Sequence, residues 1–344
     1  MNTCIPLSGA GTSRRAVLTF LFLILAGCSC KPCTDDLYCY PDLVYGSGYV
    51  AVEAGAAPEP APLRMDGIRP AGAGAERRPA VLLFHGGGFE YGSRKDENHV
   101  AMAQFLARRG YVCFLVEYRL AGESPPAPES YADPVRRAFH AAVVDAKTAL
   151  RHVTANAAAY GVDPLKTAFL GDSAGAIAAL AAGLSSPDLF ASDGPEYPVP
   201  AENFPGVETH TLAIVNLWGT GEYFPELFTP RAPPIMTVHG ALDVVVGDGL
   251  APALQIDAWC RENGTPHRFY PLPDAGHGAW DAVVDGKPLS LLIAAFLDEY
   301  LEPPPLPDPG ENGTLRLFWK RFSAMARCAP SLFGVPTAAP SCGS

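Results

Sequence analysis

The sequence is short of basic residues and of long apolar segments. Lys and Arg together number 25 in 344 residues, against 36 Asp and Glu, so the formal net charge is -11. Such a chain is poorly suited to bind nucleic acid, because phosphate contacts supply most of that affinity. The apolar run at residues 16–25 is shorter than the roughly 20 residues that a membrane-spanning helix needs. No internal repeat is visible, and the length suits one large domain.

The apolar run belongs to an N-terminal segment that is typical of export signals. Arg14 and Arg15 precede the run, and Leu-Ala-Gly-Cys at residues 25–28 follows it. This tetrapeptide resembles the bacterial lipobox, which implies a signal peptide over residues 1–27 and a lipid on Cys28. An ordinary secretory signal is the alternative, and the arginine pair also resembles a twin-arginine signal. We therefore expect an exported protein, anchored through Cys28 to a membrane at the periplasmic or cell-surface face of the cell envelope.

The cysteines are consistent with an oxidising compartment. Beyond Cys28 there are seven: Cys30, Cys33, Cys39, Cys113, Cys260, Cys328 and Cys342. Cys113 lies in an apolar run and is expected to be a buried thiol. No histidine accompanies the cluster at residues 30–39, so disulfides are favoured over a metal site. The spacing leaves the pairing open.

Strand and helix patterns alternate along residues 43–302. Two opening strands, expected near 43–52 and 63–68, are followed by apolar strands and amphipathic or Ala-rich helices in turn. This alternation predicts an α/β domain with a mostly parallel sheet of about eight strands and helices on both faces.

The segments outside this rhythm have their own compositions. Residues 28–42 are interpreted as a Cys-rich stalk, and residues 303–344 as a Pro-rich spacer followed by an extension with an amphipathic, basic stretch. Within the domain, three Pro-rich intervals are expected to form a small cap over a pocket: 122–133, 185–209 and 219–231. Four aromatic residues are candidates to line that pocket, with the core as the alternative for each: Phe89, Trp218, Tyr223 and Phe224.

Ser173 lies at the centre of Gly-Asp-Ser-Ala-Gly, residues 171–175. A β-compatible run precedes the pentapeptide and an Ala-rich segment follows it, so the serine is predicted on a sharp strand-to-helix turn. Such a turn exposes the hydroxyl and aims the amides of the following helix at the site. A chance turn of small residues is the alternative.

A second motif, His-Gly-Gly-Gly-Phe at residues 85–89, follows the apolar run 80–84. Three glycines after a core strand lose much conformational entropy on folding. Their presence is explained if main-chain amides must approach a ligand closely at this point. The amides of Gly86, Gly87 and Ala174 are the predicted donors of an oxyanion hole. His85 is interpreted as structural rather than as a catalytic base.

In this order and spacing the motifs resemble those of the α/β-hydrolase carboxylesterases, in particular the hormone-sensitive lipase-like and bacterial BD-FAE-like esterases. The resemblance runs from about residue 45 to about residue 301 and also includes Glu-Tyr-Arg-Leu at 117–120 and the segment 156–164. It implies a Ser-Asp-His order for the triad. His-Gly-Ala-Leu-Asp at 239–243 then supplies Asp243, and the loop after the last strand supplies His277.

Other residues compete for the triad roles. Asp248 and Asp274 are the alternatives for the acid, and His239 is expected to be a packed histidine beside the acid loop. Asp172 is expected to hold a turn, with a polar role beside the pocket left open.

The resulting hypothesis is ester hydrolysis through an acyl-enzyme, without a metal or organic cofactor. Short acyl chains are expected, since the Pro-rich intervals are too short for a large lid. Amides, formamides or polysaccharide acetyl groups are alternative substrates on the same triad. A non-catalytic surface binding protein on a hydrolase scaffold is the alternative of another class. The oligomeric state is left open.

Overall fold

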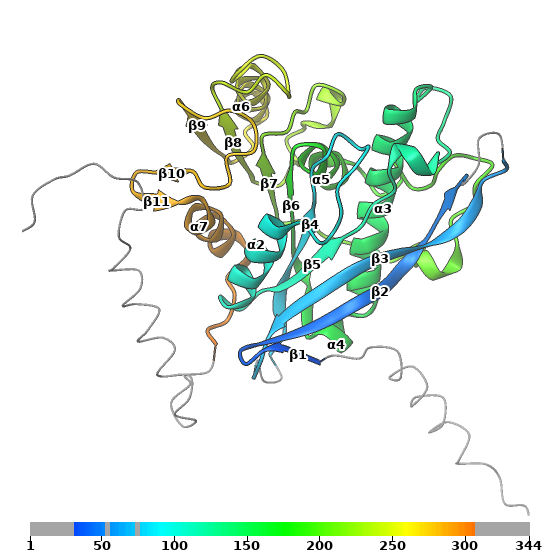
Figure 1. The fold of residues 1–344 in the computed structure, drawn as a ribbon, viewed down its shortest axis with the longest axis horizontal. Coiled ribbons are helices and arrows are strands. Elements are labelled where there is room, and N and C mark those ends of the chain that lie inside the picture. Colours follow the sequence, from blue (N-terminus) through cyan, green and yellow to red (C-terminus); the bar gives the residue numbers. More distant parts are fainter. Residues whose placement is uncertain (1–30, 52–55, 73–75, 307–344) are drawn as a thin grey trace, which may run out of the picture. The chain divides into compact units, whose positions relative to one another are not determined.

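The computed structural model describes residues 31–51, 56–72 and 76–306 (Figure 1). Its main feature is one sheet in the order β1-β2-β3-β5-β4-β6-β7-β8-β9. The strands are β1 (Lys31–Thr34), β2 (Leu37–Val50), β3 (Glu59–Pro70), β4 (Arg78–Phe84), β5 (Val112–Val116), β6 (Val162–Asp172), β7 (Ala213–Leu217), β8 (Ile235–Gly240) and β9 (His267–Leu272). Pairing is parallel from β5 through β4 to β9, and antiparallel among β1, β2, β3 and β5.

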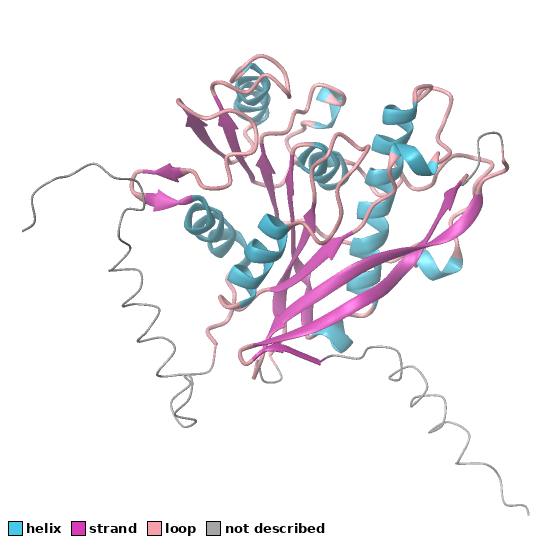
Figure 2. Ribbon diagram, viewed as in Figure 1, coloured by secondary structure: helices cyan, strands magenta, loops and turns pink. Residues whose placement is uncertain are grey.

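Helices cover both faces of this sheet, as the sequence predicts (Figure 2). They are α2 (Glu97–Ala107), α3 (Pro134–Ala155), α4 (Ala157–Tyr160), α5 (Ala174–Leu184), α6 (Ala251–Asn263) and α7 (Leu289–Leu301). Short 3-10 turns η1 (Ala121–Glu123), η2 (Ala201–Asn203) and η3 (Pro225–Leu227), and a small hairpin of β10 (Val283–Val284) and β11 (Lys287–Pro288), complete the described elements. No helix in the described ranges is both long and apolar enough to cross a bilayer.

Residues 80–84 of the central strand β4 are all apolar because helices cover both faces of the sheet there. Leu82 and Phe84 pack into the core that includes residues of α3 and α5, whereas Val81 and Leu83 pack into the core formed with α2 and α7. Since successive side chains of a strand point to opposite faces, a strand covered on both sides is apolar at every position.

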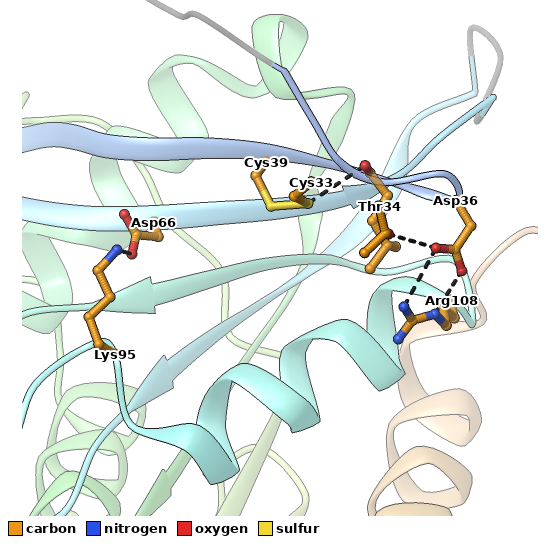
Figure 3. Close-up of a disulfide and its surroundings, with 8 residues drawn as sticks. Cys33, Thr34, Asp36, Cys39, Asp66, Lys95 and Arg108 are labelled. Carbon is orange, nitrogen blue, oxygen red and sulfur yellow. Dashed lines mark hydrogen bonds and ion pairs between the residues drawn. A yellow bond between two sulfur atoms is a disulfide. The ribbon is translucent and has the colours of Figure 1, made fainter.

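The predicted stalk over residues 28–42 is wrong from Lys31 onward, because this stretch belongs to the sheet. β1 and the start of β2 form an edge hairpin that is closed by a Cys33–Cys39 disulfide (Figure 3). The turn of the hairpin is tied down as well, because Arg108 at the end of α2 donates to Asp36 at 2.7 Å. Cys113 and Cys260 are buried free thiols, while Cys28, Cys30, Cys328 and Cys342 lie outside the described residues.

The interval 185–209, expected in the cap, packs elsewhere. Asp193 forms an ion pair with the buried Arg119, which also pairs with Asp145 of α3 at 2.7 Å. The side chain of Asn203 bonds both main-chain groups of Ser47 in β2, each at 2.8 Å. These contacts bind the interval along β2 and α3.

Candidate active site

Ser173 lies between the end of β6 and the first residue of α5, in a backbone conformation of φ 51° and ψ -122°. This positive φ is strained for a residue with a side chain. The close approach of neighbouring backbone explains the flanking glycines: a Cβ on Gly171 would lie 2.3 Å from the Gly175 oxygen, and one on Gly175 would lie 2.0 Å from the Phe84 oxygen. A larger residue at Gly171 would press on the first turn of α5, and one at Gly175 would push this turn away from β4.

The structure brings together the three side chains that the sequence singles out. His277 Nε2 lies 2.9 Å from Ser173 Oγ, and its Nδ1 lies 2.8 Å from Asp243 Oδ2. The serine and the aspartate are buried, and the histidine is partly exposed. An imidazole in this position can take the serine proton on Nε2 while the carboxylate holds Nδ1–H.

Asp243 is held by more than the histidine. Its Oδ1 accepts bonds from the amides of Val245 at 2.8 Å and Val246 at 3.1 Å. Burial opposes its charge, but the bonds from His277 and these two amides prevail and hold the pKa of the Asp243 carboxyl below its usual value. The competing acids Asp248 and Asp274 are both exposed.

His239 packs against this carboxylate, with Nε2 3.3 Å from Asp243 Oδ2. Burial lowers the pKa of His239 and favours its neutral form. It is thus a packed histidine beside the acid loop, the position that the sequence suggests.

The glycine loop after β4 needs its glycines. Gly87 has φ 118°, and a Cβ there would lie 2.1 Å from the Tyr91 oxygen. His85 stacks on Tyr118 at 4.3 Å between ring centres, and the Tyr118 hydroxyl donates to the His85 carbonyl at 2.6 Å. Burial lowers the pKa of His85, so this ring is a structural support of the loop.

A cleft of about 1070 Å³ opens above Ser173, and two parts of its lining differ in character. The first is a wall of rings in mutual contact, in which Phe139 lies within 6.2 Å of Phe89, Tyr131 and Tyr223 between centres. The second is polar apart from one indole, and consists of Asp96, Asn98, Asp172, His277 and Trp280. The cleft can therefore hold an apolar and a polar part of one ligand.

Two of the four predicted lining residues do not line this cleft. Trp218 is fully buried and packs edge-on against Trp280 at 5.4 Å. Phe224 is buried as well, stacked at 5.9 Å on Phe139. Phe89 and Tyr223 do line the cleft, and so do residues from the intervals at 122–133 and 219–231. The interval at 185–209 contributes no lining residue.

A polar chain beside Ser173 has no clear sequence signal apart from the position of Asp172. The Asp172 carboxylate lies against Gly86 and Trp218, and His99 of α2 stands between it and Asp96. Burial raises the pKa of Asp172, which His99, Trp218 and the Gly86 amide counteract. His99 is 73 residues before Asp172 in the sequence and belongs to no motif, so the sequence gives no hint of this contact.

Known protein families and proteins are similar to parts of this chain. Residues 65–220 match the BD-FAE family model. The esterase LipC of Mycobacterium tuberculosis is 27% identical over 263 residues, which cover 64% of this chain and 58% of LipC. The carboxylesterase NlhH of the same organism is 37% identical over 97 residues, 28% of this chain and 26% of NlhH. The chain thus spans less than two thirds of the length of these relatives.

Solved structures share the architecture at low identity. Esterase 2 of Thermogutta terrifontis, phosphorylated by paraoxon, superposes with a TM-score of 0.55 at 23% identity, covering 76% of this chain and 95% of that one. An acetyl ester-xyloside bifunctional hydrolase of Caldicellulosiruptor lactoaceticus gives 0.52 at 18% identity, covering 70% and 89%. At these identities the likeness concerns the fold.

Proposed function

We propose that this protein, whose described residues have the α/β-hydrolase fold, is a serine hydrolase that cleaves carboxylic esters. The observation that carries the proposal is the unbroken chain from Ser173 Oγ through His277 to Asp243, with bonds of 2.9 and 2.8 Å. The esterase relatives LipC and NlhH agree with it.

Acylation begins when Ser173 Oγ attacks the ester carbonyl and its proton passes to His277 Nε2. Asp243 stabilises the imidazolium that forms and keeps the ring in the required tautomer. The oxyanion is stabilised by main-chain amides of the glycine loop and by Ala174, the first residue of α5, where the amides of a helix are free to bind an anion. Of the predicted glycine donors we assign Gly87 this direct role, because Gly86 lies in close contact with the Asp172 carboxylate, whose pKa its amide lowers.

His277 then returns the proton to the leaving alcohol, and the acyl group remains on Ser173. In the second half, His277 activates a water that attacks the acyl carbonyl, and the acid is released. Every proton transfer uses the same Nε2, which lies within hydrogen-bonding reach of the serine.

We further propose that the acyl group is short and that the alcohol part is larger. Thermogutta terrifontis esterase 2 is known in propionate-bound and butyrate-bound forms, which supports small acyl groups by analogy. The cleft of about 1070 Å³ exceeds what such an acyl group fills, so its remainder is available for the alcohol. Amide or acetyl-polysaccharide substrates would use the same triad.

The test is labelling by a fluorophosphonate probe, with Ser173→Ala as the control. We expect the wild type to be labelled at neutral pH and the variant to remain unlabelled. A wild type that stays unlabelled would favour a non-catalytic binding protein. A series of p-nitrophenyl esters then measures the acyl preference, and equal or faster turnover of long chains would contradict the short-acyl proposal.

We also propose that the protein is exported and held at the cell envelope by a lipid on Cys28. The support is the lipobox-like sequence at residues 25–28 behind a short apolar run. Several acyl chains on one cysteine would bury enough methylenes, at about 0.8 kcal/mol each, for stable anchoring.

A further inference from the structure

We propose that Asp172 is a positioning residue of the reaction: it fixes the glycine loop through Gly86 and thereby orients the neighbouring Gly87 amide toward the oxyanion. The inference rests on the proposed function and adds to the triad a second carboxylate with a different task. The imidazole of His99 faces the Asp172 carboxylate, and Asp96 in turn holds this imidazole.

The contacts of Asp172 place it between the serine turn and the glycine loop. It is the residue before Ser173, and its side chain is only 14% exposed. Its Oδ2 would lie 2.8 Å from a Cβ on Gly86, so the carboxylate is in close contact with this glycine, and the Gly86 main-chain amide lowers the pKa of Asp172. The indole Nε1 of Trp218 donates to the same oxygen at 3.4 Å.

His99 occupies the other side of this carboxylate. Its Nε2 lies 3.3 Å from Asp172 Oδ1, and its Nδ1 lies 3.1 Å from Asp96 Oδ1. The ring is buried and meets Trp280 edge-on at 5.1 Å between centres. Asp96 also accepts the amides of Asn98 and His99 as the N-cap of α2, so the imidazole is anchored to the start of a helix. Bonding to His99 lowers the pKa of Asp96 to about 2, which keeps this anchor ionised.

A negative charge beside Ser173 needs such a partner. A carboxylate close to the developing oxyanion would oppose its formation unless a positive or donor group compensates it. His99 and Trp218 supply that compensation on two sides. The carboxylate can then contact Gly86 without disfavouring the transition state.

The glycine loop needs this contact because the backbone of consecutive glycines is flexible. Gly87 and Gly88 both have positive φ, at 118° and 64°, and glycine has many other conformations open to it. The close contact of the Asp172 carboxylate with Gly86 restrains the peptide next to Gly87. Without it, the loop would populate the arrangement that receives the oxyanion for only part of the time.

The experiment compares Asp172→Ala with Asp172→Asn, using p-nitrophenyl butyrate and a trifluoromethyl ketone, which forms an oxyanion on the serine. For alanine we expect kcat to fall by about 10- to 100-fold, less than the roughly 10²- to 10³-fold effect of losing one oxyanion donor, because the Gly87 amide is displaced for part of the time rather than removed. KM should stay within about twofold, and the inhibition constant of the ketone should rise in parallel with the loss of kcat. Asparagine should restore most of the loss, since its oxygen can accept from Gly86 and its NH2 can face His99.

The matched control is Asp257→Asn. Asp257 forms a comparable pair with His267 at 3.0 Å but does not line the cleft, so its kinetic constants should not change. The proposal is overturned if alanine keeps more than half of the wild-type kcat, or if only KM changes while the ketone binds as before. It is equally overturned if asparagine is as impaired as alanine.

A second variant and the activity of the wild type distinguish a failure of this proposal from a failure of the proposed function. Should the alanine variant be unstable by its thermal midpoint, His99→Phe takes its place, and an unchanged kcat in that variant refutes the proposal. A wild type that hydrolyses no ester and takes no fluorophosphonate would refute the proposed function. An active wild type with a fully active Asp172→Ala variant refutes only the role of Asp172.

Discussion

Asp243→Asn is the change that tests the triad most directly, because the structure shows what each side-chain atom must do. Oδ1 accepts two main-chain amides, and Oδ2 accepts Nδ1–H of His277. An asparagine has only one oxygen. If the oxygen faces the amides, NH2 faces Nδ1, which must then lose its proton and place it on Nε2. In that tautomer Nε2 cannot accept from Ser173.

The opposite amide orientation keeps the correct tautomer but directs NH2 at two donors. Leaving these two part-buried amides without an acceptor costs about 1–3 kcal/mol each, so this orientation is populated in roughly 3% to 0.004% of molecules. We therefore expect kcat to fall by about 30- to 10⁴-fold, the upper end being the effect of the wrong tautomer in serine proteases.

The assay is steady-state hydrolysis of p-nitrophenyl butyrate, with the thermal midpoint recorded for each variant. Asp248→Asn and Asp274→Asn, which change exposed acids of the same region, serve as controls and should retain wild-type kcat. A loss below tenfold in Asp243→Asn, or an equal loss in either control, would refute the reasoning.

Three other predictions concern a glycine of the serine turn, a buried histidine and the expected lipidation site. Gly175→Ala should lower kcat by at least tenfold in steady-state assays, since its Cβ would lie 2.0 Å from the Phe84 oxygen; a fully active variant would show that the turn can shift freely. Burial lowers the pKa of His140 to about 4, so the unfolded chain binds more protons between about pH 6.5 and pH 4, and the stability present above that range is lost as the pH falls. Urea unfolding at pH 7 and pH 5 should show that His140→Phe removes about 2 kcal/mol of this loss, and an unaltered pH dependence would contradict the estimate. Cys28→Ala should abolish incorporation of a palmitate analogue in a bacterial host, and labelling that persists would exclude this lipidation site.

Local patterns were enough to predict most strands and helices of this fold, but not β1 and the start of β2. The apolar run at 80–84 is a central strand buried on both faces, and Ala-rich residues 174–184 form α5. Such elements are predictable because period and composition depend on near neighbours in the chain. The helical pattern of the sequence continues over residues 134–160, but α3 ends before Asn156, which has φ -104°, and α4 follows it; one polar residue in the sequence does not indicate this break.

The site could be predicted only where a motif fixes the backbone. Ser173, Asp243 and His277 each follow a strand, and parallel strands bring their ends to one edge of the sheet. The lining of the cleft has no such rule, since burial depends on residues far apart in the sequence. Trp218 is covered by Trp280, and Phe224 by Phe139 and Phe228, and neither contact leaves a pattern in the sequence.

The bond between Asn203 and Ser47 has a consequence for how this protein behaves among its own copies. Among the residues that the structure describes, β1 pairs with β2 as far as Cys39 and leaves the rest of that border of the long strand without a neighbouring strand. Strand borders of this kind can recruit another chain and start aggregation. The carboxamide of Asn203 occupies both groups of Ser47 as a neighbouring strand would, and so blocks strand addition at the middle of that border.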